Sequence, residues 1–99
     1  MKPRRRAAAR PKALALTSEL TIAQAGDLKT RLSRLLAVDG PVSVDASATR
    51  RVDTACLQLL LAFVRDRQAA GKAVSWKATA PEFTDTARTL GICAALGLA

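Results

Sequence analysis

The residues with the clearest chemical potential lie around position 54. Asp45 and Asp53 both stand at predicted strand-to-helix junctions, where paired carboxylates can bind magnesium or carry out acid–base work. Eight residues and a turn separate them, so the sequence leaves open whether they converge, and we favour a turn or helix N-cap role for each. Thr54 opens the next predicted helix, which places its hydroxyl near free backbone N–H groups.

A phosphoryl group on Thr54 would add a charge of about −1.5 to −2 at the positive end of the helix dipole. The free N–H groups of the first turn, together with Arg50 or Arg51, would accommodate that charge. Such a group would switch a partner surface without unfolding the domain. The alternative is an unmodified Thr54 that caps the helix beside Asp53, and the residues alone favour this alternative.

Residue types that the chain lacks exclude several classes of enzyme. There is no histidine, which removes Ser-His-Asp and Cys-His nucleophilic systems and histidine metal sites. Cys56 and Cys93 are too few for a structural zinc site and lack CxxC spacing. Gly71-Lys72 looks like the end of a phosphate-binding loop, but Asp66 stands where the first glycine belongs and Ala73 replaces the serine or threonine. We therefore expect no catalytic residues, no metal, no cofactor and no enzymatic activity.

The net charge of +8 is unevenly distributed over the 99 residues. Residues 1–12 hold six of the sixteen basic side chains and no acid, whereas the rest of the chain holds ten basic and eight acidic ones. This proline-broken segment without apolar periodicity predicts a disordered basic tail (1–12) ahead of one domain (13–99).

Two interpretations of the basic tail remain. As a functional segment it would contact an anionic partner: nucleic acid, an acidic protein patch, or, peripherally, an anionic membrane surface. As a solubilising leader, or a start upstream of the true first residue, it would contact nothing. We favour the second interpretation and expect no specific nucleic-acid partner, because the domain lacks a matching basic patch, a recognition helix and an aromatic stacking surface.

No segment resembles a signal peptide or a membrane span. The longest apolar run, Leu59 to Val64, has six residues, against the ~20 that a spanning helix needs. We therefore expect a cytoplasmic protein with both thiols reduced.

The elements that must position these residues alternate along the chain. Strands are expected over 13–20 (with a turn or bulge near 18–19), 41–45 and 73–78, and helices over 21–39, 54–71, 81–91 and 92–98. Thr21 and Gln24 have the spacing of a capping box at the first helix. This alternation predicts an α/β domain with a partly parallel sheet that carries its helices on one face.

The helix over 54–71 has two apolar stripes about 120° apart. Leu57 lies on one stripe, and Cys56, Leu59 and Phe63 lie on the other. The second stripe is either a docking patch or core, and core is favoured for Phe63. Cys56 is either a redox-sensitive thiol or, as we favour, a small buried hydrophobe. Arg67 is expected to solvate the last turns of this helix.

The segment Arg51-Val52-Asp53-Thr54-Ala55-Cys56-Leu57, preceded by a strand and by Asp45-Ala46-Ser47, resembles the signature of STAS domains, the fold of bacterial anti-sigma factor antagonists. In that family a strand ends in Asp, and an Asp-Ser/Thr-small-Gly-Leu segment then opens a helix. The similarity covers residues 13–98 and implies the STAS fold, with a four- to five-stranded mixed sheet and helices packed on one face. Cys56 stands where the family usually has Gly, so we expect a side chain where a partner's backbone would approach.

The resemblance implies a regulatory protein-interaction module. In the antagonists a partner kinase phosphorylates the Ser or Thr at this position, which implies that Thr54 is the phosphoacceptor or a partner contact. The unphosphorylated form would bind a serine/threonine kinase of the histidine-kinase-like ATPase superfamily, and phosphorylation would weaken that binding. The residues expected to support the site are Asp45, Ser47, Asp53, Ala55 and Cys56, and those expected on the partner surface are Arg50, Arg51, Leu57 and Leu59.

Two other functions fit the same resemblance. Stand-alone STAS proteins also serve as cytoplasmic subunits of the ABC transporter that maintains outer-membrane lipid asymmetry, and several have Thr preceded by Arg-Val-Asp, as in residues 51–54. In that role Thr54 would contact the ATPase subunit without a kinase, and the basic tail would lie near a membrane surface. A component of a chemotaxis-type signalling cluster is the third possibility.

Overall fold

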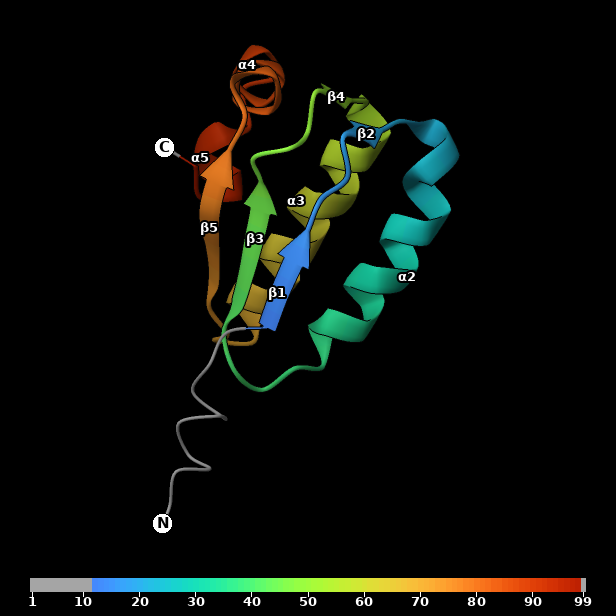
Figure 1. The fold of residues 1–99 in the computed structure, drawn as a ribbon. Coiled ribbons are helices and arrows are strands. Elements are labelled where there is room, and N and C mark those ends of the chain that lie inside the picture. Colours follow the sequence, from blue (N-terminus) through green and yellow to red (C-terminus); the bar gives the residue numbers. More distant parts are fainter. Residues whose placement is uncertain (1–11, 99) are drawn as a thin grey trace.

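Three parallel strands form the main sheet of the protein, which is described here by a computed structural model over residues 12–98 (Figure 1). Their order is β1-β3-β5, with the bounds β1 (Lys12–Ala15), β3 (Val42–Ala46) and β5 (Val74–Thr79). Buried and more exposed residues alternate along β3, so one face of the sheet is covered and the other faces outward. The expectation of helices on one face of a sheet is confirmed.

A second, two-stranded parallel ladder joins β2 (Glu19–Leu20) to β4 (Arg51–Val52). The expectation was one mixed sheet, whereas the five strands over residues 12–98 form two ladders in which every pair is parallel. The chain bends between β1 and β2 and again between β3 and β4. The backbone N–H groups of Arg50 and Arg51 both donate to the Ser18 carbonyl at these bends.

The helices follow the strands closely. They are the short 3-10 helix η1 (Ile22–Gln24), α2 (Ala25–Leu36), α3 (Thr54–Ala69), α4 (Pro81–Thr89) and α5 (Cys93–Leu96). The capping box expected between Thr21 and Gln24 is present, at the start of η1. In the part of the chain that the structure describes, no helix is both long enough and apolar enough to cross a membrane.

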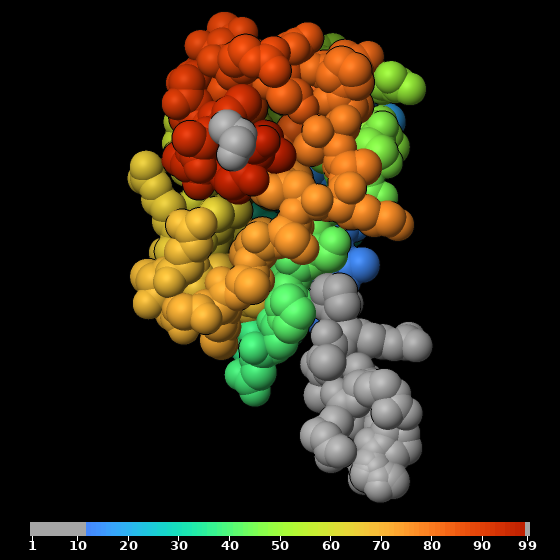
Figure 2. Space-filling view, turned by 90° about the vertical axis from the view of Figure 1, so that its left-hand side faces the viewer, coloured from blue at the N-terminus to red at the C-terminus, as the bar shows by residue number. Residues whose placement is uncertain are grey.

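Strand β5 lies at one edge of the main sheet, and the last two helices, α4 and α5, lie next to it (Figure 2). The Trp76 indole Nε1 donates a hydrogen bond to the Leu96 carbonyl of α5 at 2.8 Å. The Trp76 ring also packs against Phe83 of α4, with ring centroids 5.4 Å apart. These contacts fix α4 and α5 against the sheet.

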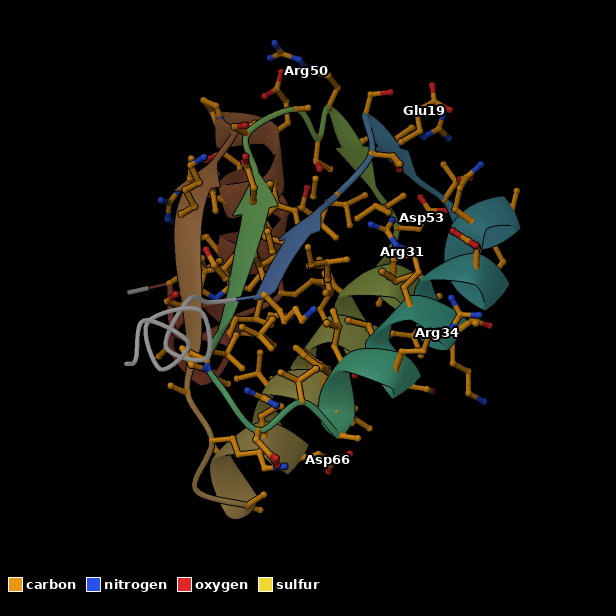
Figure 3. All side chains as sticks on the ribbon, turned by 60° about the horizontal axis from the view of Figure 1, so that its bottom comes forward. Glu19, Arg31, Arg34, Arg50, Asp53 and Asp66 are labelled. Atoms are coloured by element: carbon orange, nitrogen blue, oxygen red, sulfur yellow. The ribbon has the colours of Figure 1, made fainter. Side chains whose placement is uncertain are left out.

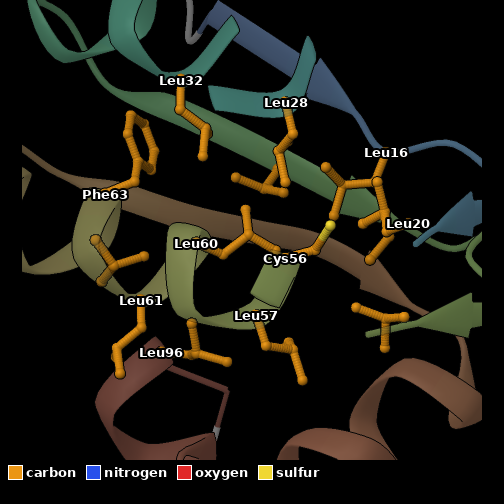
Figure 4. Packing of buried hydrophobic residues seen from close by; sticks show 14 of the residues in the cluster. Leu16, Leu20, Leu28, Leu32, Cys56, Leu57, Leu60, Leu61, Phe63 and Leu96 are labelled. Carbon is orange, nitrogen blue, oxygen red and sulfur yellow. The ribbon is translucent and has the colours of Figure 1, made fainter. Parts of the chain in front are cut away.

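The core fills the space between the main sheet and α3 (Figure 4). Helix α3 is buried on both of its apolar stripes because it packs against the sheet, α2 and α5. Phe63 and Cys56 are buried there, as expected. The buried hydrophobic side chains that α3 contributes are Cys56, Leu57, Leu60, Leu61, Phe63 and Val64.

Arg67 also lies in the interior, so the expectation that it solvates the end of α3 is wrong. Its side chain is wholly buried, and its guanidinium donates to the carbonyls of Leu35, Val38, Gly40 and Ala73. These carbonyls lie in the last turn of α2, in the loop that follows it and just before β5. Those of Leu35 and Ala73 also accept main-chain N–H groups, whereas those of Val38 and Gly40 have no other donor among the described residues. Arg67 therefore joins the end of α2, the loop before β3 and the start of β5.

The expected boundaries differ from the structure mainly at the N-terminal end. Residues 1–11 of the expected tail lie outside the described residues, whereas Lys12 is already the first residue of β1. The two-residue strand β4 has no counterpart among the expected strands. Strand β4 matters because its pairing with β2 places the residues just before Thr54 beside those just before η1.

Candidate functional site

The β2–β4 ladder brings the start of α3 beside η1. Leu20 pairs with Val52 in parallel register, and the Asp53 N–H donates to the Leu20 carbonyl at 2.8 Å. Because both chains leave the ladder in the same direction, Ile22 of η1 comes to lie beside the first residue of α3, Thr54. Segments 32 residues apart in sequence therefore form one surface.

Asp53 occupies the N-cap position of α3 with an extended backbone. Its carboxylate makes no cap hydrogen bond to its own helix. Instead, Oδ2 of Asp53, which is labelled in Figure 3, accepts a hydrogen bond from the backbone N–H of Ile22 at 3.0 Å. The expected cap role is thus correct for the backbone of Asp53, while its side chain fastens η1 to α3.

Thr54 is the first helical residue of α3 and is exposed. Asp53 holds the cap position, so the alternative in which Thr54 caps the helix is wrong. Its hydroxyl makes no hydrogen bond to any residue between 12 and 98. The hydroxyl is therefore not used to hold the fold. It lies at the end of the helix where the N–H groups of Thr54 and Ala55 have no partner among the described residues, whereas that of Cys56 donates to the Asp53 carbonyl.

Cys56 faces inward from the first turn of α3. Its thiol is buried and donates a weak hydrogen bond to the Thr21 carbonyl at 3.4 Å. Burial raises the pKa of the Cys56 thiol, and the nearby Asp53 charge raises it further. The thiol therefore stays protonated at neutral pH. The expectation that this side chain would stand in a partner's path is wrong, because it points into the core.

The other expected residues of α3 separate into buried and accessible ones. Leu57 is wholly buried, so its assignment to a partner surface is wrong. Ala55 and Leu59 are half-buried. Leu59 lines a groove of ≈150 Å³ between α2 and α3. The groove is lined by Lys29, Leu32, Ser33, Leu36, Leu59, Ala62, Phe63 and Asp66.

Asp45 and Ser47 form a separate turn at the end of β3. The Ser47 N–H donates to Asp45 Oδ1 at 2.9 Å, and the Ser47 hydroxyl and N–H lower the pKa of the Asp45 carboxyl. No hydrogen bond joins either residue to Thr54 in the described range. Since Asp45 binds Ser47 and Asp53 binds Ile22, the two acids have different partners. Across residues 12–98 there is no group of three or more His, Cys, Asp or Glu that could hold a metal.

Arg50 and Arg51 differ in their contacts. Arg50 forms an ion pair with Glu82 of α4 at 3.2 Å, and both side chains are exposed (Figure 3). The pKa of Glu82 is lowered chiefly by its own backbone N–H and further by Arg50. Arg51 is exposed and forms no ion pair with any other described residue. Of the two arginines, Arg51 is thus the one that forms no ion pair in the described range, although Glu19 is its register partner on β2.

Sequence reasoning missed Ile22. Its side chain is 70% exposed, in a first turn that is 3-10 rather than α. In a continuous α-helix Ile22 would lie about 120° around the axis from Leu28, six residues later. The spacing therefore already separates Ile22 from the buried stripe, and this was the signal that could have marked it as exposed.

A comparison with known families gives the identity of the fold. A family model described as "Mlab, STAS domain" matches residues 4–97. The chain belongs to the STAS-domain family. The match begins inside the segment expected to be a tail. No curated protein matches the chain significantly.

Membership of the STAS family supports a general function. The chain is an anti-sigma factor antagonist-like regulatory module, and STAS domains of this kind act through protein–protein contacts. The surface formed by η1 and the first turn of α3 is where this STAS domain exposes the residue that the family signature marks, Thr54.

Proposed function

We propose that Thr54 switches a protein-binding surface. The unphosphorylated chain binds a serine/threonine kinase of the histidine-kinase-like ATPase superfamily, and phosphorylation of Thr54 by that kinase weakens the complex. The observation that carries this proposal is the exposed Thr54 hydroxyl, which makes no hydrogen bond within residues 12–98. A hydroxyl that holds nothing in place can be modified without unfolding the domain.

The chemistry of the switch is a phosphoryl transfer. The Thr54 Oγ1 attacks the γ-phosphorus of the kinase's ATP, the bond to the β-phosphate oxygen breaks, the hydroxyl proton goes to the kinase's base, and ADP leaves. The product carries about −1.5 to −2 charge. The first-turn N–H groups and the exposed Arg51 favour this charge, whereas the adjacent Asp53 carboxylate opposes it. We also propose that the chain has no catalytic activity of its own.

The phosphate would change the surface locally. It would add bulk and charge at the first residue of α3, beside the half-buried carboxylate of Asp53. A partner that packs closely on Thr54 would meet both changes. The core beneath, including Cys56 and Leu57, is already closed and would not need to move.

The test uses three tagged baits in lysate of the source organism: wild type, Thr54→Glu and Thr89→Glu. Thr89 is exposed at the end of α4, so its variant carries the same charge change elsewhere. We expect wild type and Thr89→Glu to retain an anti-sigma-type kinase, and Thr54→Glu to lose it. The purified kinase with ATP should then add one phosphoryl group to wild type and none to Thr54→Ala, as measured by intact mass.

Two outcomes would contradict the switch. Equal capture of the kinase by all three baits would show that charge at Thr54 does not control binding. Phosphorylation of Thr54→Ala as readily as wild type would place the phosphoacceptor at another residue.

A second candidate is a STAS subunit that regulates the ATPase of a lipid-asymmetry ABC transporter. It is favoured by the description of the matching family model, "Mlab, STAS domain", and by the resemblance of Arg51-Val52-Asp53-Thr54 to such subunits. In that role Thr54 would contact the ATPase subunit directly. Capture of an ABC ATPase by wild type, with no phosphorylation of Thr54, would establish this candidate in place of the kinase. Both candidates place the chain in the bacterial cytoplasm.

A further inference from the structure

Ile22 is the most exposed large hydrophobic residue between positions 12 and 98. Its side chain is 70% exposed, and the other exposed large hydrophobic residue of this range, Leu90, is 41% exposed. Single exposed apolar side chains are common on protein surfaces. Exposure alone therefore does not mark Ile22 as a binding residue, whereas the contacts around it do.

The backbone around Ile22 is held by side chains from two sides. The Asp53 carboxylate accepts the Ile22 N–H at 3.0 Å, and the buried Cys56 thiol donates to the Thr21 carbonyl at 3.4 Å. Within the turn, Gln24 Oε1 accepts the Thr21 N–H at 2.9 Å. The first two hydrogen bonds fix η1 against the first turn of α3, and the third holds the turn itself.

A side chain on a fixed backbone is suited to binding. Ordering of loops and side chains opposes association, and this cost is reduced for Ile22 because its main chain is already held. Buried apolar side chains near the centre of an interface contribute most of the affinity, whereas peripheral contacts contribute little. The parallel ladder, with Leu20 opposite Val52, and the hydrogen bond from the Ile22 N–H to Asp53 place Ile22 next to the residue that precedes Thr54, on the proposed surface.

We propose that Ile22 is the apolar anchor of the partner surface and that Asp53 is its positioning residue. The partner is a protein with an apolar pocket for Ile22 and a hydrogen-bond donor at the pocket's rim. That donor would face the half-buried Asp53 carboxylate, which forms no ion pair within the described chain. This inference rests on the proposed function only in using the same protein partner.

The test measures affinity for the purified kinase or ATPase subunit identified above, by calorimetric titration. Ile22→Ser should weaken binding about tenfold or more, as removal of a central anchor does. Leu90→Ser, which makes a similar change at the other exposed site, should alter it by less than about twofold. An Ile22→Ser affinity within twofold of wild type, or an equal loss from Leu90→Ser, would overturn the proposal. Circular dichroism confirms that both variants are folded.

The positioning role of Asp53 is tested by hydrogen exchange as well as by affinity, because a loss of affinity alone would not show that Asp53 holds Ile22. Asp53→Ala should speed hydrogen exchange of the Ile22 amide and weaken binding, while Asp53→Asn, which keeps an acceptor oxygen, should restore both. Unchanged exchange in Asp53→Ala would remove its positioning role.

The outcomes separate this inference from the proposed function. If Thr54→Glu prevents binding but Ile22→Ser does not weaken it, the switch stands and the anchor fails. If Ile22→Ser weakens binding and Thr54→Glu does not, the anchor stands and the switch fails. If wild type captures neither partner class, both fail.

Discussion

The Arg67 guanidinium, on α3, donates a hydrogen bond to the carbonyl of Gly40 at 2.7 Å, 27 residues earlier in the chain. Three further carbonyls accept from the same guanidinium, whose Nε has no partner in the described structure. A buried charge is costly unless its hydrogen bonds are satisfied, and here main-chain oxygens satisfy it in place of an acid. Arg67 thus fixes the C-terminal end of α3, whereas Thr54 lies at the N-terminal end of the same helix.

Replacing Arg67 should strongly destabilise the fold. Arg67→Met would leave the Val38 and Gly40 carbonyls without a donor and remove one of two donors at Leu35 and Ala73. We expect the free energy of unfolding to fall by about 3 kcal/mol. Arg67→Lys should recover only part of this, because an ammonium lacks the planar fork. Urea denaturation measures both values. Arg65→Met, at an exposed position two residues away, should cost less than about 0.5 kcal/mol; equal losses at 65 and 67 would contradict the argument.

Asp53→Ala should cost about 1 kcal/mol of unfolding free energy. The variant removes the acceptor for the Ile22 N–H, whereas the cap of α3 loses no hydrogen bond, because the Asp53 carboxylate makes none to its own helix. Asp53→Asn should be close to wild type, since its side-chain oxygen can accept the same bond. Asp66→Ala, an exposed acid on the same helix, provides the control. A chemical-denaturation midpoint for Asp53→Ala that matches the control would show that the Asp53 bond adds no stability.

Cys56 should resist thiol reagents in the folded protein. Its pKa is raised by burial and by the Asp53 charge, so the reactive thiolate is suppressed. In a Cys93→Ser background, a thiol-specific reagent at pH 8 should label Cys56 only after denaturant is added. Rapid labelling of the native variant would mean that the first turn of α3 opens readily.

The same shift gives Cys56 a pH-dependent contribution to stability. A thiol whose pKa is higher in the folded than in the unfolded state stabilises the fold fully below its ordinary pKa, and the contribution is lost as the pH rises through the folded value. Stability should therefore decline in alkaline solution, and less so in Cys56→Ala. Thermal melts from pH 7 to 10 make the comparison; parallel declines in the two proteins would assign the effect to other groups.

Ser47→Ala should raise the pKa of Asp45 toward its ordinary value. The Ser47 hydroxyl is the largest cause of the lowered pKa, and the Ser47 N–H, which the variant keeps, is the second. A lowered carboxyl pKa stabilises the fold above the ordinary pKa, and this contribution is lost as the pH falls through the folded value. Titration by NMR of the Asp45 side-chain carbon measures the shift. Ser43→Ala, two residues earlier on β3, should leave it unchanged.

Much of the architecture follows from local pattern. The apolar stripe of α2, the Thr21–Gln24 capping box and the strand over 42–46 could be predicted, because period, cap and turn residues act over a few positions. The burial of Arg67 could not be predicted, since charged residues near a helix end are usually solvated. Its burial depends on carbonyls from α2 and β5 that converge only after folding.

The sequence by itself determined the α/β alternation, the STAS resemblance and Thr54 as the residue to test, because the family signature is contiguous. Only the tertiary structure decided that Leu57 is core, that Thr54 is exposed without a hydrogen bond in the described range, and that Ile22 lies next to Asp53, the residue before Thr54. The physical reason is that these facts depend on long-range contacts: α3 packs against the sheet, α2 and α5, and β2 pairs in parallel with β4. That pairing joins residues 32 positions apart, and local pattern carries no record of it.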